Sequence, residues 1–127
     1  MTLWNGEKVV HTEGEWRAKL GEERYFVMRQ KGTEKPFSSR LRGSSFYRCA
    51  GCDLPLFHCK DFLALENGWP NFSKPISPKN VYYLEDWELG FKRYEVLCRG
   101  CDSHLGHVFQ TPSKNTLRYC VNGIALH

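Results

Sequence analysis

The residues best suited to chemistry lie between Cys98 and Asn122, in the stretch CRGCDSHLGHVFQTPSKNTLRYCVN. A guanidinium near a thiol lowers the thiol's pKa and favours the nucleophilic thiolate. We therefore interpret Cys120 as a candidate nucleophile activated by Arg118. His104 and His107 are the candidate proton donors, because imidazole titrates near neutrality. Residue types alone leave open that this cysteine is a buried small hydrophobe and that both histidines are ordinary loop residues.

Two Cys-x-Gly-Cys pairs form the strongest pattern in the chain. They comprise Cys49, Cys52, Cys98 and Cys101. Two intervening residues let both sulfurs of a pair reach one face of a tetrahedral ion, and glycine suits the tight turn between them. We predict one zinc ion per chain, with a structural role because four thiolates leave no open position. A redox dithiol or paired disulfides remain alternatives.

The first part of the chain is expected to supply short helices and loops. Thr12 followed by Glu15 predicts a capping box, and Trp16 and Leu20 lie on one helical face before Gly21 ends the helix. A second short helix is expected over residues 22–30. Residues 31–45 are rich in Gly, Ser and Pro and predict a loop.

The remainder of the chain predicts strands. Short aromatic or β-branched runs occur at residues 45–48, 81–84, 92–97, 105–109 and 117–121, and they are bounded by Gly, Pro or Asn. Between the first two runs, residues 53–78 contain four prolines and predict a long, ordered loop. The expected fold is therefore mostly antiparallel β, with short N-terminal helices.

Length and composition exclude several classes of protein. The 127 residues fit one domain, residues 1–127, and carry a net charge of +4 without a block of like charges. We expect neither a nucleic-acid partner nor a membrane segment, because the longest apolar runs are only a few residues. The N-terminus has no signal-peptide pattern, so a reducing, cytoplasmic location with free thiols is expected.

Several ordered motifs resemble methionine-R-sulfoxide reductase, the B type. They are CAGCDLPLF, GWPNF, CRGCDSHLGHVF and RYCVN, preceded by RQKGTEKPF and FYRCAGC. The likeness covers most of the chain from about Trp16 onward. It implies a small, barrel-like fold of two antiparallel sheets, a β-tent, with zinc away from the catalytic thiol.

The resemblance also implies an activity: reduction of the R epimer of methionine sulfoxide, in oxidised proteins or peptides or as the free amino acid. Cys120 would attack the sulfoxide sulfur and become a sulfenic acid, which thioredoxin recycles. His107 and His104 would assist the developing oxygen. Arg118 and Asn122 would shape the site. The substrate would be bound by Trp69, which packs its methyl group, and by Phe109. We expect a monomer.

This chain departs from the family pattern at three places. An Asp-Gly-Pro turn usually follows the histidine segment, whereas this chain has Thr111-Pro112, so a carboxylate that could orient a histidine is missing there. Gly123 replaces a usual serine. The usual recycling cysteine is Asn67 here, which leaves Cys59 as the candidate resolving thiol or as a bystander.

Two rival functions remain at this stage. A zinc-stapled β binding module would use a basic patch at Lys92, Arg93 and Arg99, but it leaves Cys120 and the paired histidines unexplained. A thiol peroxidase would use the same cysteine with peroxide. Trp69 beside an apolar pocket argues instead for a thioether-like group.

Overall fold

A computed structural model describes residues 3–39, 41, 43–111 and 116–127. It begins with two helices, α1 (Glu13–Leu20) and α2 (Glu22–Arg29). The predicted capping box is confirmed, since Thr12 and Glu15 exchange side-chain to backbone hydrogen bonds of 2.8 and 3.2 Å. Trp16 and Leu20 are buried, as expected. Because α1 is only two turns long, its stability depends on this cap and on burial.

Eight strands follow the helices. In chain order they are β1 (Phe46–Arg48), β2 (Pro55–His58), β3 (Phe62–Leu63), β4 (Asn71–Phe72), β5 (Val81–Asp86), β6 (Arg93–Cys98), β7 (His104–Gln110) and β8 (Leu117–Val121). Three short 3-10 turns lie between or after them, η1 (Cys59–Asp61), η2 (Pro78–Asn80) and η3 (Gly123–Ala125).

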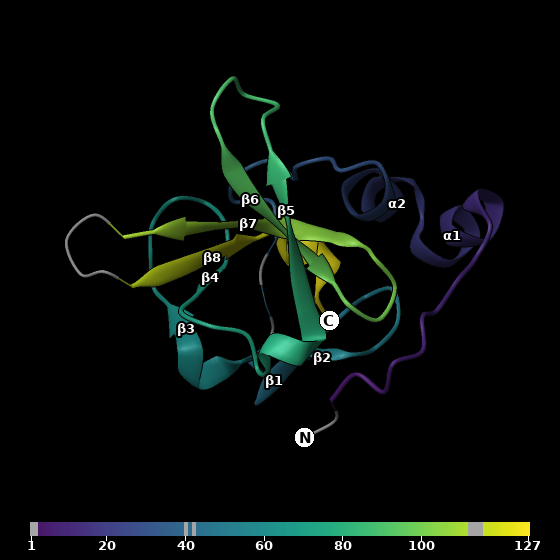
Figure 1. Ribbon diagram of the computed structural model, residues 1–127, viewed down its shortest axis with the longest axis horizontal. Coiled ribbons are helices and arrows are strands. Elements are labelled where there is room, and N and C mark those ends of the chain that lie inside the picture. The colour runs from purple at the N-terminus through teal and green to yellow at the C-terminus, as the bar shows by residue number, and fades with distance from the viewer. Residues whose placement is uncertain (1–2, 40, 42, 112–115) are drawn as a thin grey trace.

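The strands form two antiparallel sheets. β1 pairs with β2, and the larger sheet has the order β3-β4-β8-β7-β6-β5. The mostly β prediction is confirmed. The barrel-like closure is not found among the described strands, because β3 and β5 form the two edges of the larger sheet and do not pair with each other. Figure 1 shows the β5–β6 hairpin projecting at the top and both helices to one side of the sheet.

The prediction that residues 53–78 form a loop was wrong in part. The segment contributes β2, β3 and β4. Strands of two residues are too short to show an alternating pattern, so their pairing with distant strands decides their structure. Asn71 of β4 pairs with Cys120 of β8, so this segment is built directly into the candidate site.

The core joins the helices to both sheets. Phe57 and Phe72 stack with ring centroids 4.5 Å apart, and both are fully buried. Met28 of α2 belongs to the same cluster. Among the described residues, no helix has both the length and the apolar character needed to cross a membrane.

Candidate active site and metal cluster

Cys120 lies in a row of residues that crosses the larger sheet. It pairs with Asn71 on one side and with His107 on the other, and His107 pairs in turn with Glu95 of β6. Residues directly opposite each other in antiparallel strands present their side chains on the same face. The row therefore places a thiol, an imidazole and a carboxylate on one face of three adjacent strands.

A β-bulge brings the second histidine to the same face. Val96 of β6 pairs with Gly106, while the next residue, Leu97, pairs with His104, which leaves one extra residue on β7. Residues three apart on a regular strand point to opposite faces, and an extra residue reverses that relation. The rings of His104 and His107 consequently lie 5.5 Å apart.

Each histidine of β7 is held by a carboxylate from another strand of the sheet, Glu95 of β6 or Asp86 of β5. His104 Nδ1 is 2.7 Å from Glu95 Oε2, and His107 Nε2 is 2.6 Å from Asp86 Oδ2. These contacts fix the ring orientations, and the carboxylates stabilise the protonated rings. His104 is only 3% exposed, and its Nε2 has no hydrogen-bond partner among the described residues. The carboxylate that the Thr111-Pro112 segment lacks is thus supplied by other strands, whereas Pro112 itself lies outside the described residues.

Asp86 is the charged centre of this network. Burial alone raises its pKa, but hydrogen bonds from the Glu88 N–H, His107 and Lys31 outweigh burial and hold the pKa well below its usual range. Arg93 Nη2 adds an ion pair at 3.2 Å. Asp86 is therefore an anion at neutral pH although it is only 2% exposed.

The pKa of His107 is lowered, mainly because burial disfavours the charged ring. The hydrogen bond to Asp86 acts in the opposite direction, and the positive charge of Arg93 reinforces burial. His107 is therefore neutral at rest at neutral pH. Any proton that it donates in a reaction depends on Asp86 to stabilise the protonated ring.

The expectation that Arg118 gives Cys120 a low pKa was wrong in its net direction. Burial raises the pKa of the Cys120 thiol, and the charge and hydrogen bond of Arg118 only partly oppose it. Arg118 also has contacts with other groups: Nη1 donates to Asn71 Oδ1 at 3.1 Å, and the guanidinium lies 4.7 Å from the Phe109 ring centre. Cys120 at rest is therefore a thiol whose conversion to thiolate requires a base.

A pocket of about 170 Å³ opens over this group. Its lining includes all the candidate catalytic and substrate-binding residues except Arg118 and Cys59, namely Cys120, His104, His107, Asn122, Trp69 and Phe109. Thr33 and Arg93 also reach it. The pocket thus combines a thiol and two imidazoles with two aromatic walls.

Buried Glu34 ties the far side of the pocket together. Its carboxylate accepts hydrogen bonds from the backbone N–H groups of Gly123 and Ile124, and its backbone carbonyl accepts one from Trp69 Nε1. Asn122 Oδ1 accepts the Glu34 N–H at 3.0 Å. This residue therefore fixes both the tryptophan wall and the chain just after Cys120.

Gly106 permits the close approach of β7 to β8. A Cβ at this position would overlap the carbonyl oxygen of Cys120 and crowd Val121. Glycine is therefore required for steric reasons, since its backbone does not adopt a positive φ.

The four pair-forming cysteines converge into one cluster. Their sulfurs all lie within 4.8 Å of one another, and Cys49–Cys101 and Cys52–Cys98 are 3.7 and 3.5 Å apart. Cys98 ends β6, three residues beyond Glu95, so strand spacing puts it roughly 14 Å from Cys120. The cluster can hold a metal ion, and it stands apart from the candidate nucleophile.

The glycines of the two pairs serve a different purpose from the one expected. Neither Gly51 nor Gly100 has a positive φ. A Cβ on Gly51 would lie 3.2 Å from Cys101 Sγ, and one on Gly100 would lie 2.7 Å from Cys52 Sγ. Each glycine therefore leaves room for a sulfur of the opposite pair, while the aspartate after each pair takes the left-handed conformation.

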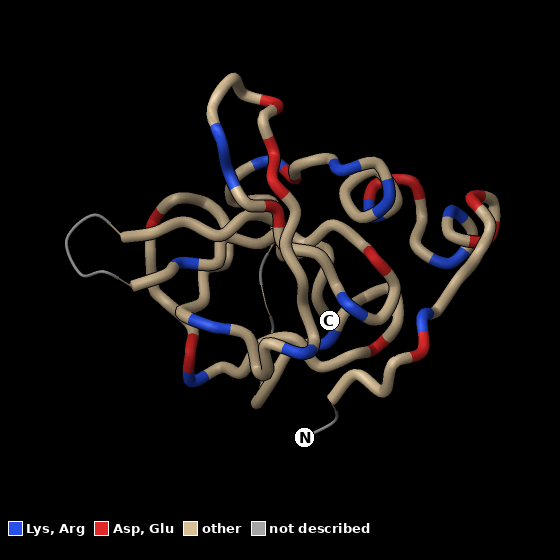
Figure 2. Tube along the Cα trace, in the orientation of Figure 1, with Lys and Arg blue, Asp and Glu red and all other residues tan. Residues whose placement is uncertain are grey.

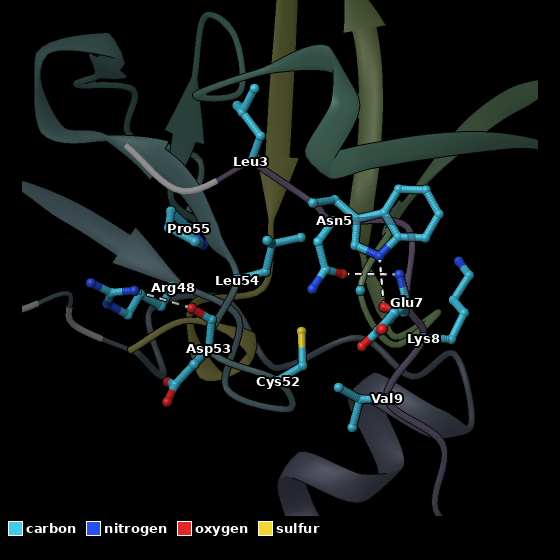
Figure 3. A pocket seen from close by; sticks show the side chains of 12 residues that line it. Leu3, Asn5, Glu7, Lys8, Val9, Arg48, Cys52, Asp53, Leu54 and Pro55 are labelled. Carbon is cyan, nitrogen blue, oxygen red and sulfur yellow. Dashed lines mark hydrogen bonds between the residues drawn. The ribbon is translucent and has the colours of Figure 1, made fainter.

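Cys52 is the most accessible member of the cluster. It is partly exposed, whereas the other three are buried. Figure 3 shows its side chain at a pocket of about 290 Å³ between the N-terminal segment and the loop carrying Asp53 and Leu54. A reagent that attacks the cluster therefore meets this sulfur first.

Cys59 is exposed and lies outside the row that holds Cys120. It begins η1, just before β3, and Leu63 of β3 is already two strands, about 10 Å, from Cys120. Asn67, at the usual recycling position, exchanges hydrogen bonds with Asn71, the direct partner of Cys120. Position 67 therefore lies close to the thiol, while Cys59 needs the loop to move.

Four residues of the site were missed by sequence reasoning: Asp86, Glu95, Asn71 and Glu34. All are buried polar side chains with partners far away in the chain. The available signal was weak: Glu95 lies within the predicted strand 92–97, and Asp86 lies two residues beyond the predicted strand 81–84. Nothing in the local pattern distinguishes these carboxylates from exposed ones.

Comparison with known proteins gives consistent matches over nearly the whole chain. Residues 20–127 match the SelR domain family. Among curated relatives, the peptide methionine sulfoxide reductase MsrB of Chromohalobacter salexigens is 42% identical over 125 residues, which cover 94% of each chain. The proteins of the same name from Pseudomonas fluorescens and Pseudomonas entomophila are 43% and 44% identical over 124 residues, covering 94% of this chain and 95% of each relative.

Proposed function

Because the chain belongs to the SelR domain family of methionine sulfoxide reductases, we propose that it reduces the R epimer of methionine sulfoxide through the thiol of Cys120. The observation that carries the proposal is the pocket in which this thiol faces two carboxylate-held histidines and an aromatic wall. A sulfoxide sulfur is electrophilic only when its oxygen receives a proton or a strong hydrogen bond. The pocket offers both the nucleophile and the donors.

The reaction begins with proton transfer inside the site. Neutral His107 takes the proton of the Cys120 thiol, which gives a thiolate and an imidazolium that Asp86 stabilises. The thiolate attacks the sulfoxide sulfur while the imidazolium returns the proton to the oxygen. The new S–S bond and the S–O bond then both break as the hydroxyl passes to the cysteine sulfur, which yields a sulfenic acid and the reduced thioether. The methionine sulfur gains the two electrons that the cysteine sulfur loses.

His104 stabilises the same oxygen from a second direction. Its Nδ1 is engaged by Glu95, so a protonated ring would present Nε2 to the pocket. Hydrogen-bond donors directed at developing charge in a water-poor site lower the barrier because they need no reorganisation. The unpartnered Nε2 supports this role.

Selection of the R epimer follows from the two sides of the pocket. The methyl group of the substrate packs against Trp69 and Phe109, and the oxygen faces the histidines. The S epimer exchanges the positions of oxygen and methyl, so its oxygen would lie against an apolar wall without donors. Asn122 and Arg118 hold the strand and its flanking aromatic ring in place.

Recycling requires a second thiol. A dithiol protein of the thioredoxin type condenses with the sulfenic acid, releases water, and then resolves the mixed disulfide with its second thiol. Cys59 is the internal candidate for the first of these steps, and it must approach Cys120 to within a Cα separation of roughly 7 Å. The thiols of this cycle must remain reduced between turnovers, which fits a reducing compartment such as the cytoplasm.

We propose zinc as the ion of the cysteine cluster. Four thiolates are a donor set that zinc favours, and bonds of about 2.3 Å imply tetrahedral sulfur separations of about 3.8 Å, close to the observed 3.5 and 3.7 Å. When bound, zinc would crosslink the loop after β1 to the end of β6 and thereby stabilise the fold. Its four ligands leave no position for substrate.

The rival basic binding patch has little free charge. Lys92 and Arg93 pair with Glu85 and Asp86, and Arg99 packs against Trp4 and Tyr82. Figure 2 shows acidic residues on one arm of the β5–β6 hairpin and basic residues on the other. Neutralised pairs of this kind do not favour phosphate binding.

The test is an assay on the separated R and S epimers of a peptide-bound methionine sulfoxide. The wild-type protein is expected to reduce only the R form, with one equivalent converted per chain before reductant is added. Cys120→Ser should abolish that turnover with unchanged metal content and thermal unfolding. Cys59→Ser is the matched thiol control and should complete the single turnover. Reduction of the R epimer by Cys120→Ser would refute the proposal.

A further inference from the structure

We propose that an apolar groove beside the catalytic pocket binds uncharged, apolar residues that flank methionine sulfoxide in a polypeptide substrate. We call it the flank groove. It has a volume of about 480 Å³, and its lining includes Phe37, Leu41, Tyr47, Phe62, Leu65 and Trp69. The inference rests on the proposed function, because the groove is useful only if the reacting sulfoxide sits over Cys120.

The flank groove is continuous with the catalytic pocket through one side chain. Trp69 lines both cavities. Its indole is fixed, since Nε1 donates to the Glu34 carbonyl at 3.1 Å and its backbone N–H donates to Asn67 Oδ1 at 3.1 Å. A peptide whose methionine sulfoxide packs on one side of this ring therefore has its neighbouring residues at the groove.

The chemistry of the lining defines the occupant. None of the described residues lining the flank groove is charged, and most of them are aromatic or aliphatic. Phe37, Phe62 and Leu65 are exposed large hydrophobic residues, and Phe37 is 75% exposed. Clustered exposed apolar side chains next to a binding pocket mark a recognition surface. An apolar peptide segment buries them, whereas a charged segment would lose hydration without gaining a partner.

The groove is also preformed on one side. Phe37 has a φ of 63°, a conformation that is unfavourable for an aromatic residue. It is held there because its N–H donates to the Gly68 carbonyl at 2.7 Å, on the loop that carries Trp69. A Cβ on Gly68 would collide with Pro36, so only glycine allows these two loops to meet. A strained residue that the surrounding structure fixes in this way is typical of a ligand clamp.

The test compares substrates that differ only beyond the reacting residue. Three R-sulfoxides are used. The first is a capped single residue (N-acetyl-methionine sulfoxide amide), the second is a pentapeptide with leucine and valine flanks, and the third is the same pentapeptide with aspartate flanks. We expect the wild-type kcat/KM to be at least about tenfold higher for the apolar peptide than for the other two. That ratio corresponds to about 1.4 kcal/mol, within the range for partial burial of one large apolar side chain.

Phe37→Ser and Leu65→Ser should each remove most of the higher kcat/KM for the apolar peptide, by raising its KM. For the capped residue, kcat/KM should stay within about twofold of the wild-type value. Phe91→Ser is the matched control, because Phe91 is also an exposed phenylalanine, lies on the distant β5–β6 loop and should change neither value. Unchanged thermal unfolding checks that the variants fold. The proposal would be overturned if both groove variants kept the wild-type preference for the apolar peptide. It would also be overturned if the wild-type protein were a dimer that Phe37→Ser dissociates. Failure to reduce any of the three R-sulfoxides would refute the proposed function instead.

Discussion

Replacement of Asp86 by asparagine tests the proposed proton transfer most directly. The carboxylate is 2.6 Å from His107 Nε2, and it is also contacted by Arg93 and Lys31. An asparagine keeps the size of the side chain but cannot offer a charged acceptor. A hydrogen bond to a charged group contributes about 1.5–3 kcal/mol, so the protonated ring of His107 should lose about that much stabilisation.

The sign of the effect follows from the pKa directions in the wild-type protein. His107 has a pKa below its usual 6.5, and Cys120 has a pKa above its usual 9.0. The reactive form, with thiolate and imidazolium, carries the same number of protons as the neutral pair. The kcat/KM value should therefore rise with pH through the lowered histidine pKa, remain level, and fall above the raised cysteine pKa.

Asp86 raises the pKa of His107, so Asp86→Asn should lower it further, by about one to two units. The acid limb of the profile should move to lower pH. The level region should fall by about 10- to 150-fold, because a smaller share of the singly protonated enzyme is in the reactive form.

The assay is the pH dependence of kcat/KM for an R-sulfoxide peptide. Glu85→Gln is the control, since it removes a neighbouring carboxylate that contacts Lys92 and Trp87 rather than His107. It should leave the profile unchanged. A profile of Asp86→Asn that coincides with the wild type, in a protein with unchanged thermal unfolding, would refute the role of His107 as the proton carrier.

Three further predictions concern other parts of the molecule. Cys52→Ser should release the metal ion and lower the unfolding temperature, measured by metal analysis and thermal unfolding; full metal retention would show a different ligand set. Gly106→Ala should lower the free energy of unfolding by about 3 kcal/mol, because the added methyl group overlaps the Cys120 carbonyl. Urea unfolding measures this change, and a loss below about 1 kcal/mol would contradict the steric argument. If Cys59 resolves the sulfenic acid, the Cys59→Ser variant should stop after one turnover when thioredoxin is the sole reductant. Sustained turnover at the wild-type rate would exclude that role and would assign the reduction to the external dithiol.

The sequence by itself determined those features that short, local patterns encode. The capping box at Thr12 depends on residues three apart, and the two Cys-x-Gly-Cys pairs place their sulfurs within single turns. The short aromatic and β-branched run at residues 117–121 likewise predicted the strand that carries Cys120. For this reason the first helix, the convergence of the four paired cysteines, the mostly β class and the family could all be predicted before any tertiary contact was known.

The tertiary structure decided what depends on strand register. The bulge opposite Leu97 turns His104 toward the same face as His107, and no local pattern distinguishes a bulged strand from a regular one. Register also selects Glu95 and Asp86, among many carboxylates, as the partners of the histidines.

The direction of the Cys120 pKa illustrates the same limit. The sequence placed Arg118 near the thiol, but burial depends on how β4, β7 and β8 pack around it and outweighs the guanidinium. The position of Cys59 likewise depends on the short strands β3 and β4, whose pairing is too brief to leave a sequence signal. The charge of a side chain can be inferred from its residue type. Its desolvation and its distance from other groups are decided only when distant segments of the chain pack together.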